Sequence, residues 1–337
     1  MSKKFLIIQL RKLGDVLLTT PVIDVLKDNF PKAQIDFFTE TPFYDIASYN
    51  PKLTNLFLLN KHSIKDQLYT LRKIRRQKYD YALDFFGNPR SAWWAFFSGA
   101  KNRLGYDYPG RKHLYNICVK RDMKPKYVVD FKMDLLKPLG IDSDYLKTSI
   151  YVQANIREKM LNFIKEKGWN GYDKIVGLVT PNNRDVSRVK NWRFDGFADL
   201  AQKVIKELNA HVLILWGPGE QEEMRKLKSM INNDKVIVSP GMNVKELAGI
   251  LSYCSVVVTS CGGSKHIAVS QDVPTVTIFG PTQEKCWNPP TDKNIAVKAK
   301  NLECIECDQT SCSRMDCMKL VTTDMVFNAV KKILDNK

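Results

Sequence analysis

One aspartate follows the first apolar run of the chain, where a helical pattern begins. Phe5–Leu10 (FLIIQL) is almost continuously apolar, which is typical of a strand buried on both faces. Asp15 stands just before the helical spacing of Val16–Asn29. A carboxylate at this point could act as a general base toward a substrate hydroxyl. The alternative is that Asp15 caps the helix, a common role of aspartate that contributes about 1 kcal/mol.

A pair of glycines follows a strand-like run in the second half of the chain. Val256–Thr259 leads into Ser-Cys-Gly262-Gly263, and His266 lies one turn into the next helical pattern. Glycines let backbone N–H groups approach a ligand closely, and the first turn of a helix favours anions. The segment therefore suits a diphosphate, with His266 as a further donor. The alternatives are a tight turn for the glycines and a packing or capping role for His266.

Two more polar loops follow predicted strands. The strand that ends at Thr180 leads into a loop with three basic side chains, and Thr180 and Lys190 could contact phosphate. An exposed basic loop is the alternative. The strand at 211–216 leads into Gly-Pro-Gly-Glu220-Gln-Glu222. An acidic group at that place could meet a ribose hydroxyl, or it could stabilise the first turn of a helix.

Short β-rich runs alternate with longer helical patterns in both halves, which predicts an α/β protein with parallel sheets covered by helices. Such sheets bind ligands beyond the carboxyl ends of their strands, and the polar loops described above lie there. The segment 140–172 lacks strand signals. We therefore expect two domains, 1–155 and 156–337, with a final helix at 324–334 that could pack on either.

The predicted elements can be stated by their ranges. The predicted strands are Phe5–Leu10, Ile35–Phe38, Leu56–Leu59, Tyr81–Phe85, Lys174–Thr180, His211–Trp216, Lys235–Val238, Val256–Thr259 and Thr275–Phe279. The predicted helices are Val16–Asn29, Ile64–Gln77, Val128–Leu139, Phe194–Leu208, Gln221–Ile231, Val244–Tyr253, Ser264–Gln271 and Asp324–Leu334.

The charge of the chain is uneven and points to an anionic partner. The 337 residues carry a net charge of +16, and 44% are hydrophobic and 26% charged, which excludes whole-chain disorder and a collagen-like or coiled-coil composition. The stretch 61–126 alone holds 16 basic and 5 acidic side chains. Such a local positive field suits nucleic acid, anionic lipid or a phosphorylated substrate. A solvated basic face is the alternative.

The first residues and the cysteines indicate the compartment. The apolar run Phe5–Leu10 is too short for a signal segment, and no run of the sequence reaches the length of a membrane span. We therefore expect a cytosolic chain whose cysteines are mostly reduced.

Four of the eight cysteines gather near the end of the chain, at Cys304, Cys307, Cys312 and Cys317. Four thiols at short spacing could form a structural zinc site, but this spacing is unlike a standard zinc ribbon or finger. Free thiols or disulfides are the default expectation. Packing is the role we expect for Cys118, Cys254 and Cys286.

Several of these segments together resemble the lipopolysaccharide heptosyltransferases, glycosyltransferase family 9. They are KFLIIQLRKLGDVLLTTPVIDVL, VTPNNRDVSRVKNW, LILWGPGEQEE and GGSKHIAVSQDVPTVTIFGPTQ, in family order over roughly residues 3–320, with a loose match at 40–130. The resemblance implies a GT-B fold, in which two Rossmann-like domains face each other across a cleft. It also implies inverting transfer of heptose from ADP-heptose to the lipopolysaccharide inner core, with no cofactor and no catalytic metal.

The resemblance assigns roles to particular residues. Asp15 matches the catalytic base. The residues that match the donor site are Lys190 and Thr180 at the phosphates, Gly262, Gly263 and His266 at the diphosphate turn, Met242 near the adenine, and Glu220 or Glu222 at the ribose.

One position departs from the family pattern. Cys261 stands where the family usually has an acidic residue that contacts hydroxyls of the donor sugar. A thiol is a weak hydrogen-bond partner and is normally uncharged. The departure implies a different donor sugar, a shifted contact or reduced activity. A non-catalytic paralogue that binds a nucleotide sugar is therefore an alternative.

The resemblance also gives the basic stretch 61–126 a specific partner. We expect this stretch, together with Arg11 and Lys12, to face a phosphorylated lipopolysaccharide core acceptor. We also expect it to face the anionic inner surface of the inner membrane, where the chain binds peripherally. The aromatic side chains that could enter this interface, or could belong to a buried helix instead, are Trp93, Trp94, Phe96 and Phe97.

Two other classes of protein share some of these features. A nicotinamide oxidoreductase would share the α/β pattern, but the first strand is not followed by G-x-G-x-x-G. A nucleic-acid-binding protein would share the charge, but no helix-turn-helix, zinc-finger or ribonucleoprotein signature is present. We therefore expect neither a nicotinamide cofactor nor a nucleic-acid partner.

Overall fold

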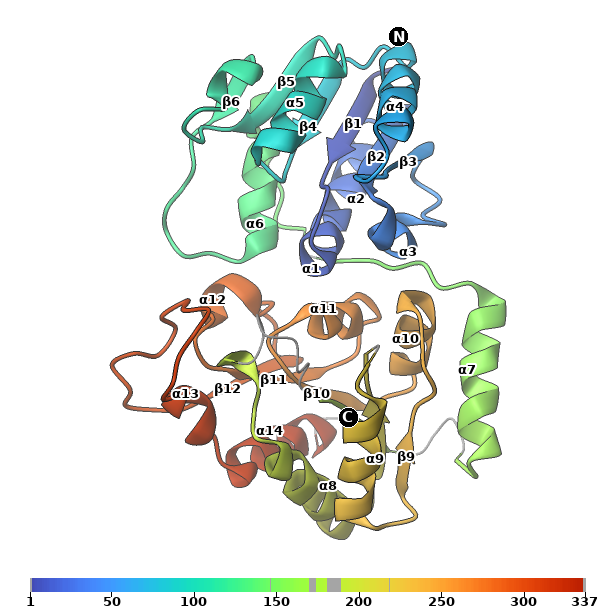
Figure 1. Cartoon of the computed structure of the whole chain (residues 1–337), viewed down its shortest axis with the longest axis vertical. Coiled ribbons are helices and arrows are strands. Elements are labelled where there is room, and N and C mark those ends of the chain that lie inside the picture. The colour runs from blue at the N-terminus through green and yellow to red at the C-terminus, as the bar shows by residue number, and fades with distance from the viewer. Residues whose placement is uncertain (1, 146, 170–173, 181–188, 218, 336–337) are drawn as a thin grey trace. The chain divides into compact units, whose positions relative to one another are not determined.

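The apolar runs of the chain form two six-stranded parallel sheets in the computed structural model, one in each of two compact units (Figure 1). The units are Met1–Tyr151 and Val152–Lys337. The structure describes residues 2–145, 147–169, 174–180, 189–217 and 219–335. The boundary expected between 155 and 156 lies inside the first helix of the second unit, α7 (Ala154–Glu166).

The sheet of the first unit has the strand order β3-β2-β1-β4-β5-β6, and all neighbouring strands are parallel. Its strands are β1 (Lys4–Ile8), β2 (Gln34–Glu40), β3 (Asn55–Leu59), β4 (Tyr81–Asp84), β5 (Asn102–Tyr106) and β6 (Ile117–Val119). The four predicted strands of this half correspond to β1–β4, whereas β5 and β6 were not predicted. Because the chain order reverses between β1 and β4, loops after these two strands lie together at one edge.

Helices cover both faces of this sheet. They are α1 (Leu13–Leu17), α2 (Thr20–Asn29), α3 (Tyr44–Ala47), α4 (Ile64–Arg76), α5 (Pro89–Phe97) and α6 (Val128–Met133), with 3₁₀ turns at Thr41–Phe43, Lys112–Leu114 and Asp134–Leu139. Helices α4 and α5 pack side by side on one face, against Leu6 and Ile8 of β1 (Figure 1).

The helix predicted over Val16–Asn29 is two helices, α1 and α2. The reason is local, because Pro21 has no N–H and cannot donate to the carbonyl of Leu17 four residues earlier. The hydroxyl of Thr20 donates to that carbonyl instead, at 2.8 Å. The helical turn is therefore restarted, and Pro21 stands in the first turn of α2, where a missing N–H costs nothing.

The sheet of the second unit has the order β12-β11-β10-β7-β8-β9 and is also fully parallel. Its strands are β7 (Ile175–Val179), β8 (His211–Leu215), β9 (Val236–Val238), β10 (Val256–Ser260), β11 (Thr275–Phe279) and β12 (Asn294–Lys298). The predicted strands of this half correspond to β7–β11, and β12 was not predicted.

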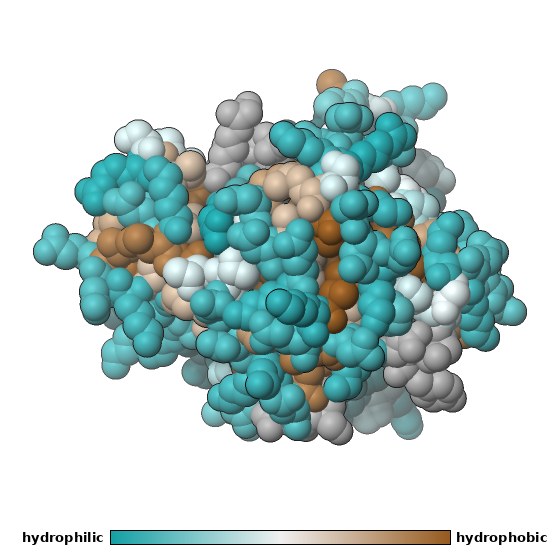
Figure 2. Space-filling model, turned by 90° about the horizontal axis from the view of Figure 1, so that it is seen from below, coloured by the Kyte–Doolittle hydropathy of each residue, from teal (hydrophilic) through white to brown (hydrophobic). Residues whose placement is uncertain are grey.

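The helices of the second unit lie on the two faces of its sheet. After α7 come α8 (Phe194–Leu208), α9 (Gln221–Ile231), α10 (Val244–Leu251), α11 (Gly263–Ser270), α12 (Glu284–Trp287), α13 (Asp316–Lys319) and α14 (Thr323–Asp335). The final helix α14 packs beside α8, and Phe327 and Val330 join the core of this unit. Seen from below, the surface is mainly hydrophilic, and apolar side chains show only in narrow strips (Figure 2).

No helix among the described residues has the length and apolar character that a membrane span needs.

Candidate functional site

Asp15 lies in the first turn of α1, beyond the carboxyl end of β1. It is the third residue of the helix rather than its N-cap, because Lys12 occupies the cap position. Its carboxylate accepts a hydrogen bond from the backbone N–H of Lys12 at 3.4 Å, and its side chain is half-buried. Asp15 therefore supports the start of the helix and still presents a carboxylate at the edge of the sheet.

A buried lysine lies behind this loop. Lys132 of α6 is 4% exposed, and its Nζ donates to Oε1 of Gln9 at 2.9 Å. Gln9 in turn donates to the carbonyl of Arg11 at 2.7 Å, which ties the lysine to the loop before Asp15. Burial lowers the pKa of Lys132 to about 8, although the negative charges of Asp15 and Asp84 act in the opposite direction.

Asp84 ends β4, the strand next to β1, and is fully buried. Its carboxylate accepts backbone hydrogen bonds from Phe86 and Gly87, both at 3.0 Å, and one from the hydroxyl of Tyr115 at 2.7 Å. Burial raises the pKa of Asp84, and these hydrogen bonds oppose the rise. Both oxygens of the Asp84 carboxylate therefore accept hydrogen bonds, and we assign Asp84 the role of holding the loop after β4 in place.

The glycine pair lies at the start of α11, beyond the end of β10. Gly262 is the N-cap residue, is exposed and has an extended backbone with φ of −165°. A Cβ placed on Gly262 would meet only the carbonyl of Ser260, at 3.9 Å. Neither its conformation nor its neighbours within the chain require glycine here. The missing side chain leaves the N-terminal N–H groups of α11 open to an anion.

Three side chains around this turn are buried. Cys261 is 9% exposed, and burial raises the pKa of its thiol, while the positive charges of Lys265 and Lys190 oppose the rise. Burial lowers the pKa of Lys265 to about 8, and its ammonium group donates to the carbonyl of Trp287. Burial also lowers the pKa of His266 well below its usual value, with Lys265 adding to the effect, so its imidazole is neutral at pH 7.

His266 is less accessible than the sequence suggested. It is 3% exposed, and its ring centroid lies 6.2 Å from that of Trp287. Its Nδ1 has no hydrogen-bond partner among the described residues. A neutral, buried imidazole contributes a single N–H donor, which is weaker toward phosphate than the charged donor of a lysine.

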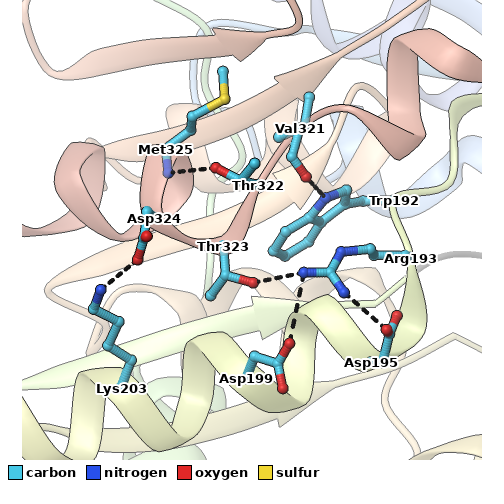
Figure 3. Close-up of polar contacts among 10 residues, drawn as sticks. All are labelled: Trp192, Arg193, Asp195, Asp199, Lys203, Val321, Thr322, Thr323, Asp324 and Met325. Carbon is cyan, nitrogen blue, oxygen red and sulfur yellow. Dashed lines mark hydrogen bonds and ion pairs between the residues drawn. The ribbon is translucent and has the colours of Figure 1, made fainter.

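Lys190 lies just before an anchored residue, Trp192, and residues 181–188 before it lie outside the described residues. Lys190 is half-buried, and its charge acts on Cys261 beside the glycine turn. Trp192 donates from its backbone N–H to Oγ of Ser260 at 3.4 Å and from Nε1 to the carbonyl of Val321 at 2.9 Å. Val321, just before α14, thus holds Trp192, two residues after Lys190 (Figure 3 shows the contact of Trp192 with Val321).

Arg193 extends this anchor. Its guanidinium donates to Oδ2 of Asp195 at 2.8 Å and to Oγ1 of Thr323 at 2.9 Å (Figure 3). A further pair joins Lys203 of α8 with Asp324 of α14. These contacts hold α8 and the residue before it against the beginning of α14.

The other candidates of the second unit differ in position. Thr180 is buried, and its hydroxyl donates to the sulfur of Met224 at 3.0 Å, so it is engaged within the fold rather than offered to a phosphate. Glu220 is buried in the loop after β8 and accepts from the backbone N–H of Gly217 at 2.8 Å. Glu222 is exposed and pairs with Arg225, 3.7 Å away. Of the two acids, Glu220 is the one that the fold places at the edge of the sheet.

The remaining candidates lie at the surface or near it. Met242 is half-buried between β9 and α10. Arg11 and Lys12 are exposed beside Asp15, and the guanidinium of Arg11 lies 6.0 Å from the ring centroid of Phe86. The basic stretch 61–126 contains α4, β4, α5, β5 and β6. Among the aromatic side chains of α5, Trp94 is 9% exposed, whereas Trp93, Phe96 and Phe97 are exposed. The interpretation of this aromatic run as a buried helix therefore holds for Trp94 alone.

The cysteines are all free thiols. Cys304, Cys307 and Cys312 are exposed and Cys317 is buried. Among the described residues, which include all four, no group of three or more potential ligands is arranged to hold a metal ion, so the zinc interpretation finds no assembled site. Of the cysteines expected to pack, Cys254 is buried, but Cys118 is exposed.

Sequence reasoning did not find the buried lysines Lys132 and Lys265 or the anchor Trp192. Lys265 stands next to His266, but a lysine in a helical pattern normally indicates a solvated face. Only the burial of Lys265 in the folded chain distinguishes it from a surface lysine.

Comparison with known proteins gives a consistent result. The model of glycosyltransferase family 9 (heptosyltransferase) matches residues 68–318. The lipopolysaccharide heptosyltransferase 3 of Escherichia coli (strain K12) is 23% identical over 334 residues, which cover 95% of each chain.

Two solved structures have the same fold. The family 9 glycosyl transferase from Veillonella parvula has a TM-score of 0.86 at 21% identity, over 99% of this chain and 98% of that chain. The Escherichia coli heptosyltransferase WaaC with ADP-2-deoxy-2-fluoro heptose has a TM-score of 0.72 at 19% identity, over 99% of each chain. The two parallel sheets thus match those of heptosyltransferase structures, and the expected fold class is confirmed.

Proposed function

The chain belongs to glycosyltransferase family 9, the heptosyltransferases, and we propose from this premise that it transfers heptose from ADP-heptose to the lipopolysaccharide inner core. The proposal includes inversion at the anomeric carbon and no cofactor or catalytic metal. The observation that supports it is the start of α11, which lies within the residues that the family model matches. Because Gly262 has no side chain, the first N–H groups of this helix are free to donate to a diphosphate, and the charge of Lys190 acts on the neighbouring Cys261.

The proposed reaction is a direct displacement. Asp15 takes the proton from an acceptor hydroxyl while that oxygen forms a bond with the anomeric carbon. The bond from this carbon to the phosphate oxygen breaks, and ADP leaves with additional negative charge. Lys190 and the first N–H groups of α11 stabilise that charge, because donors fixed in advance are most effective where charge develops.

The nucleotide specificity is tested by thermal unfolding of the full chain with a panel of sugar nucleotides. We expect ADP and ADP-heptose to raise the unfolding midpoint, and UDP- and GDP-sugars to have little effect. The panel includes other ADP-sugars, because Cys261 leaves the identity of the transferred sugar open. Protection by UDP- or GDP-sugars without protection by ADP-heptose would contradict the proposed donor.

The same assay tests Lys190. Hydrogen bonds to charged groups contribute about 1.5–3 kcal/mol, so Lys190→Ala is expected to weaken ADP affinity by about tenfold to a hundredfold. The matched control is Lys174→Ala, which removes an exposed lysine just before β7. Equal ADP affinity in both variants would remove Lys190 from the phosphate site.

We propose that Lys132 is a positioning residue for the Asp15 loop, and its burial makes a pH-dependent prediction. The pKa of Lys132 is about 8 in the folded chain and 10.5 in an unfolded one. Between these values the unfolded chain holds a proton that the folded chain has lost, so the contribution of Lys132 to folding stability rises with pH. Relative to Lys132→Met, the wild-type chain should gain about 2 kcal/mol between pH 7 and pH 9.5.

Urea unfolding of the full chain, with hydrogen exchange of the β1 amides as the probe, measures this difference. Lys32→Met, at an exposed lysine of the same unit, is the control and should show no such gain. A pH-independent difference for Lys132→Met would mean that the lysine is not buried as described.

A further inference from the structure

Cys261 leaves one end of the proposed donor site without a strong acceptor of hydrogen bonds. It directly follows β10 and is 9% exposed, and a neutral thiol is a weak hydrogen-bond partner. The hydroxyl groups of a sugar donate most strongly to a carboxylate, because an ionised acceptor strengthens a hydrogen bond. Transfer of a sugar from this site therefore calls for a carboxylate that another segment supplies.

The segment between β12 and α13 lies across the loop that follows β11. The backbone N–H of Glu306 donates to the carbonyl of Gly280 at 3.0 Å. The backbone N–H of Asp308 donates to the carbonyl of Pro281 at 2.7 Å. Gly280 leaves no room for a side chain, because a Cβ at this position would overlap Met318 of α13. Strands β10 and β11 are neighbours, so this segment is held beside the glycine turn that follows β10.

The carboxylate of Asp308 is held in place but is not neutralised. Its Oδ2 accepts a hydrogen bond from Nε2 of Gln283, in the loop after β11, at 2.6 Å. Among the residues that the structure describes, no cation forms an ion pair with this exposed side chain. The neighbouring acids differ, because Lys298 pairs with Glu306 at 2.9 Å and with Glu284 at 2.8 Å. Asp308 therefore retains its negative charge for a ligand.

The charge of Asp308 reaches Cys261. Burial raises the pKa of the Cys261 thiol, and the negative charge of Asp308 adds to this rise. Charges at a surface are screened by salt over about 10 Å, so the two side chains lie near each other. The backbone agrees with this proximity. The N–H of Cys261 donates to the carbonyl of Ile278 in β11 at 3.2 Å, and the loop after β11 binds Asp308.

The strand order separates the two ends of the donor. In the order β12-β11-β10-β7-β8-β9, the glycine turn follows β10. Glu220, which we match to the ribose, follows β8 on one side of this turn, and Asp308 lies over the loop after β11 on the other side. A nucleotide with its ribose at Glu220 and its diphosphate at the turn therefore extends its sugar toward Asp308.

We propose that Asp308 binds hydroxyl groups of the donor sugar and takes the role that Cys261 cannot perform. Oδ1 accepts from the sugar while Gln283 holds Oδ2. A carboxylate repels a diphosphate, so this role leaves the phosphates to the start of α11 and places Asp308 at the sugar end. The ligand class is an ADP-sugar with adjacent hydroxyl groups. This inference rests on the proposed function, because it assigns a further residue of the same donor site.

Asp308→Asn tests the assignment, because it removes the charge and changes little else. Asp308 has a positive φ of 53°, which asparagine also adopts readily, and the amide oxygen can still accept from Gln283. Isothermal titration of the full chain measures the affinity for ADP and for ADP-heptose. We expect Asp308→Asn to weaken ADP-heptose binding by about tenfold, since an ionised acceptor forms a stronger hydrogen bond than a neutral one, and to leave ADP binding unchanged.

Asp292→Asn is the matched control, because it neutralises an exposed carboxylate just before β12, at the opposite edge of the same sheet. It should bind both ligands like wild type. Cys261→Asp, added to Asp308→Asn, should recover most of the lost affinity for ADP-heptose, which a purely structural role of Asp308 would not allow. Circular dichroism verifies the fold of every variant.

Equal affinity for ADP-heptose in Asp308→Asn and Asp292→Asn would overturn the assignment and leave the proposed function intact. A parallel loss of ADP and ADP-heptose binding in Asp308→Asn would also overturn it, because ADP lacks the transferred sugar. Wild-type binding of UDP- or GDP-sugars in place of ADP-sugars would contradict the proposed function. The same comparison, made with the sugar nucleotide that binds and with its nucleoside diphosphate, would then still decide the role of Asp308.

Discussion

Asp15→Asn is expected to lower turnover by about a hundredfold to ten-thousandfold, because it removes a general base and changes little else. The amide oxygen of asparagine can still accept the hydrogen bond that the backbone N–H of Lys12 donates to Asp15. The start of α1 should therefore survive. Turnover of ADP-heptose with a lipopolysaccharide core acceptor measures the loss, and protection of the chain by ADP against thermal unfolding should stay at the wild-type level.

Asp28→Asn provides the comparison, since it neutralises an exposed carboxylate at the end of α2 in the same unit. It should retain wild-type turnover. Normal turnover of Asp15→Asn would remove Asp15 from the role of base. An equal loss in both variants would indicate a general effect of charge on the first unit.

Trp192→Ala is expected to destabilise the second unit by about 3–5 kcal/mol. Trp192 is 1% exposed, and its ring meets that of Phe197 edge-on with centroids 5.0 Å apart. The truncation leaves a cavity and also leaves the carbonyl of Val321 without its indole donor. Urea unfolding, followed by hydrogen exchange of amides in β10, gives the free-energy difference.

Trp192→Phe separates the two contributions. Phenylalanine keeps most of the ring volume but loses Nε1, so it should cost about 1–3 kcal/mol through the unpaired carbonyl of Val321 and a smaller cavity. Trp192 stands two residues after Lys190, and its contact with Val321 (Figure 3) holds this part of the chain. ADP affinity should therefore fall in Trp192→Ala and be nearly retained in Trp192→Phe. A stable Trp192→Ala chain would contradict the anchoring role.

The central strands were predictable because each is buried on both faces. Strands such as β1 and β10 are short aliphatic runs, and their length and branched side chains favour a buried strand over a helix. The strands that were missed have weaker patterns. β6 and β12 are at the edges of their sheets and are only partly buried, and β5 contains Asn102, Arg103 and Gly105. The edge strands β3 and β9 were predicted, so position at an edge is not the reason; most side chains of β6 and β12 are only partly buried and need not be apolar, which weakens the apolar signal.

The positions of Asp15 and the glycine pair were predictable for a similar reason. In a parallel sheet, residues that directly follow strands must come to one edge, whatever the details of packing. The direction of a side chain at that edge does not follow from this rule. Thr180 turned inward to the sulfur of Met224, and of the two acids after β8 only Glu220 folded back onto its loop.

The sequence by itself determined the alternation of strands and helices, the loops that carry Asp15, Lys190 and Gly262, and the local excess of positive charge. These three features follow from the order and the periodicity of neighbouring residues, and they do not depend on which distant segments of the chain come into contact. Only the tertiary structure decided that Lys132 and Lys265 are buried and that Trp93 is exposed. Burial depends on which distant segments cover a side chain, and no local pattern contains that information.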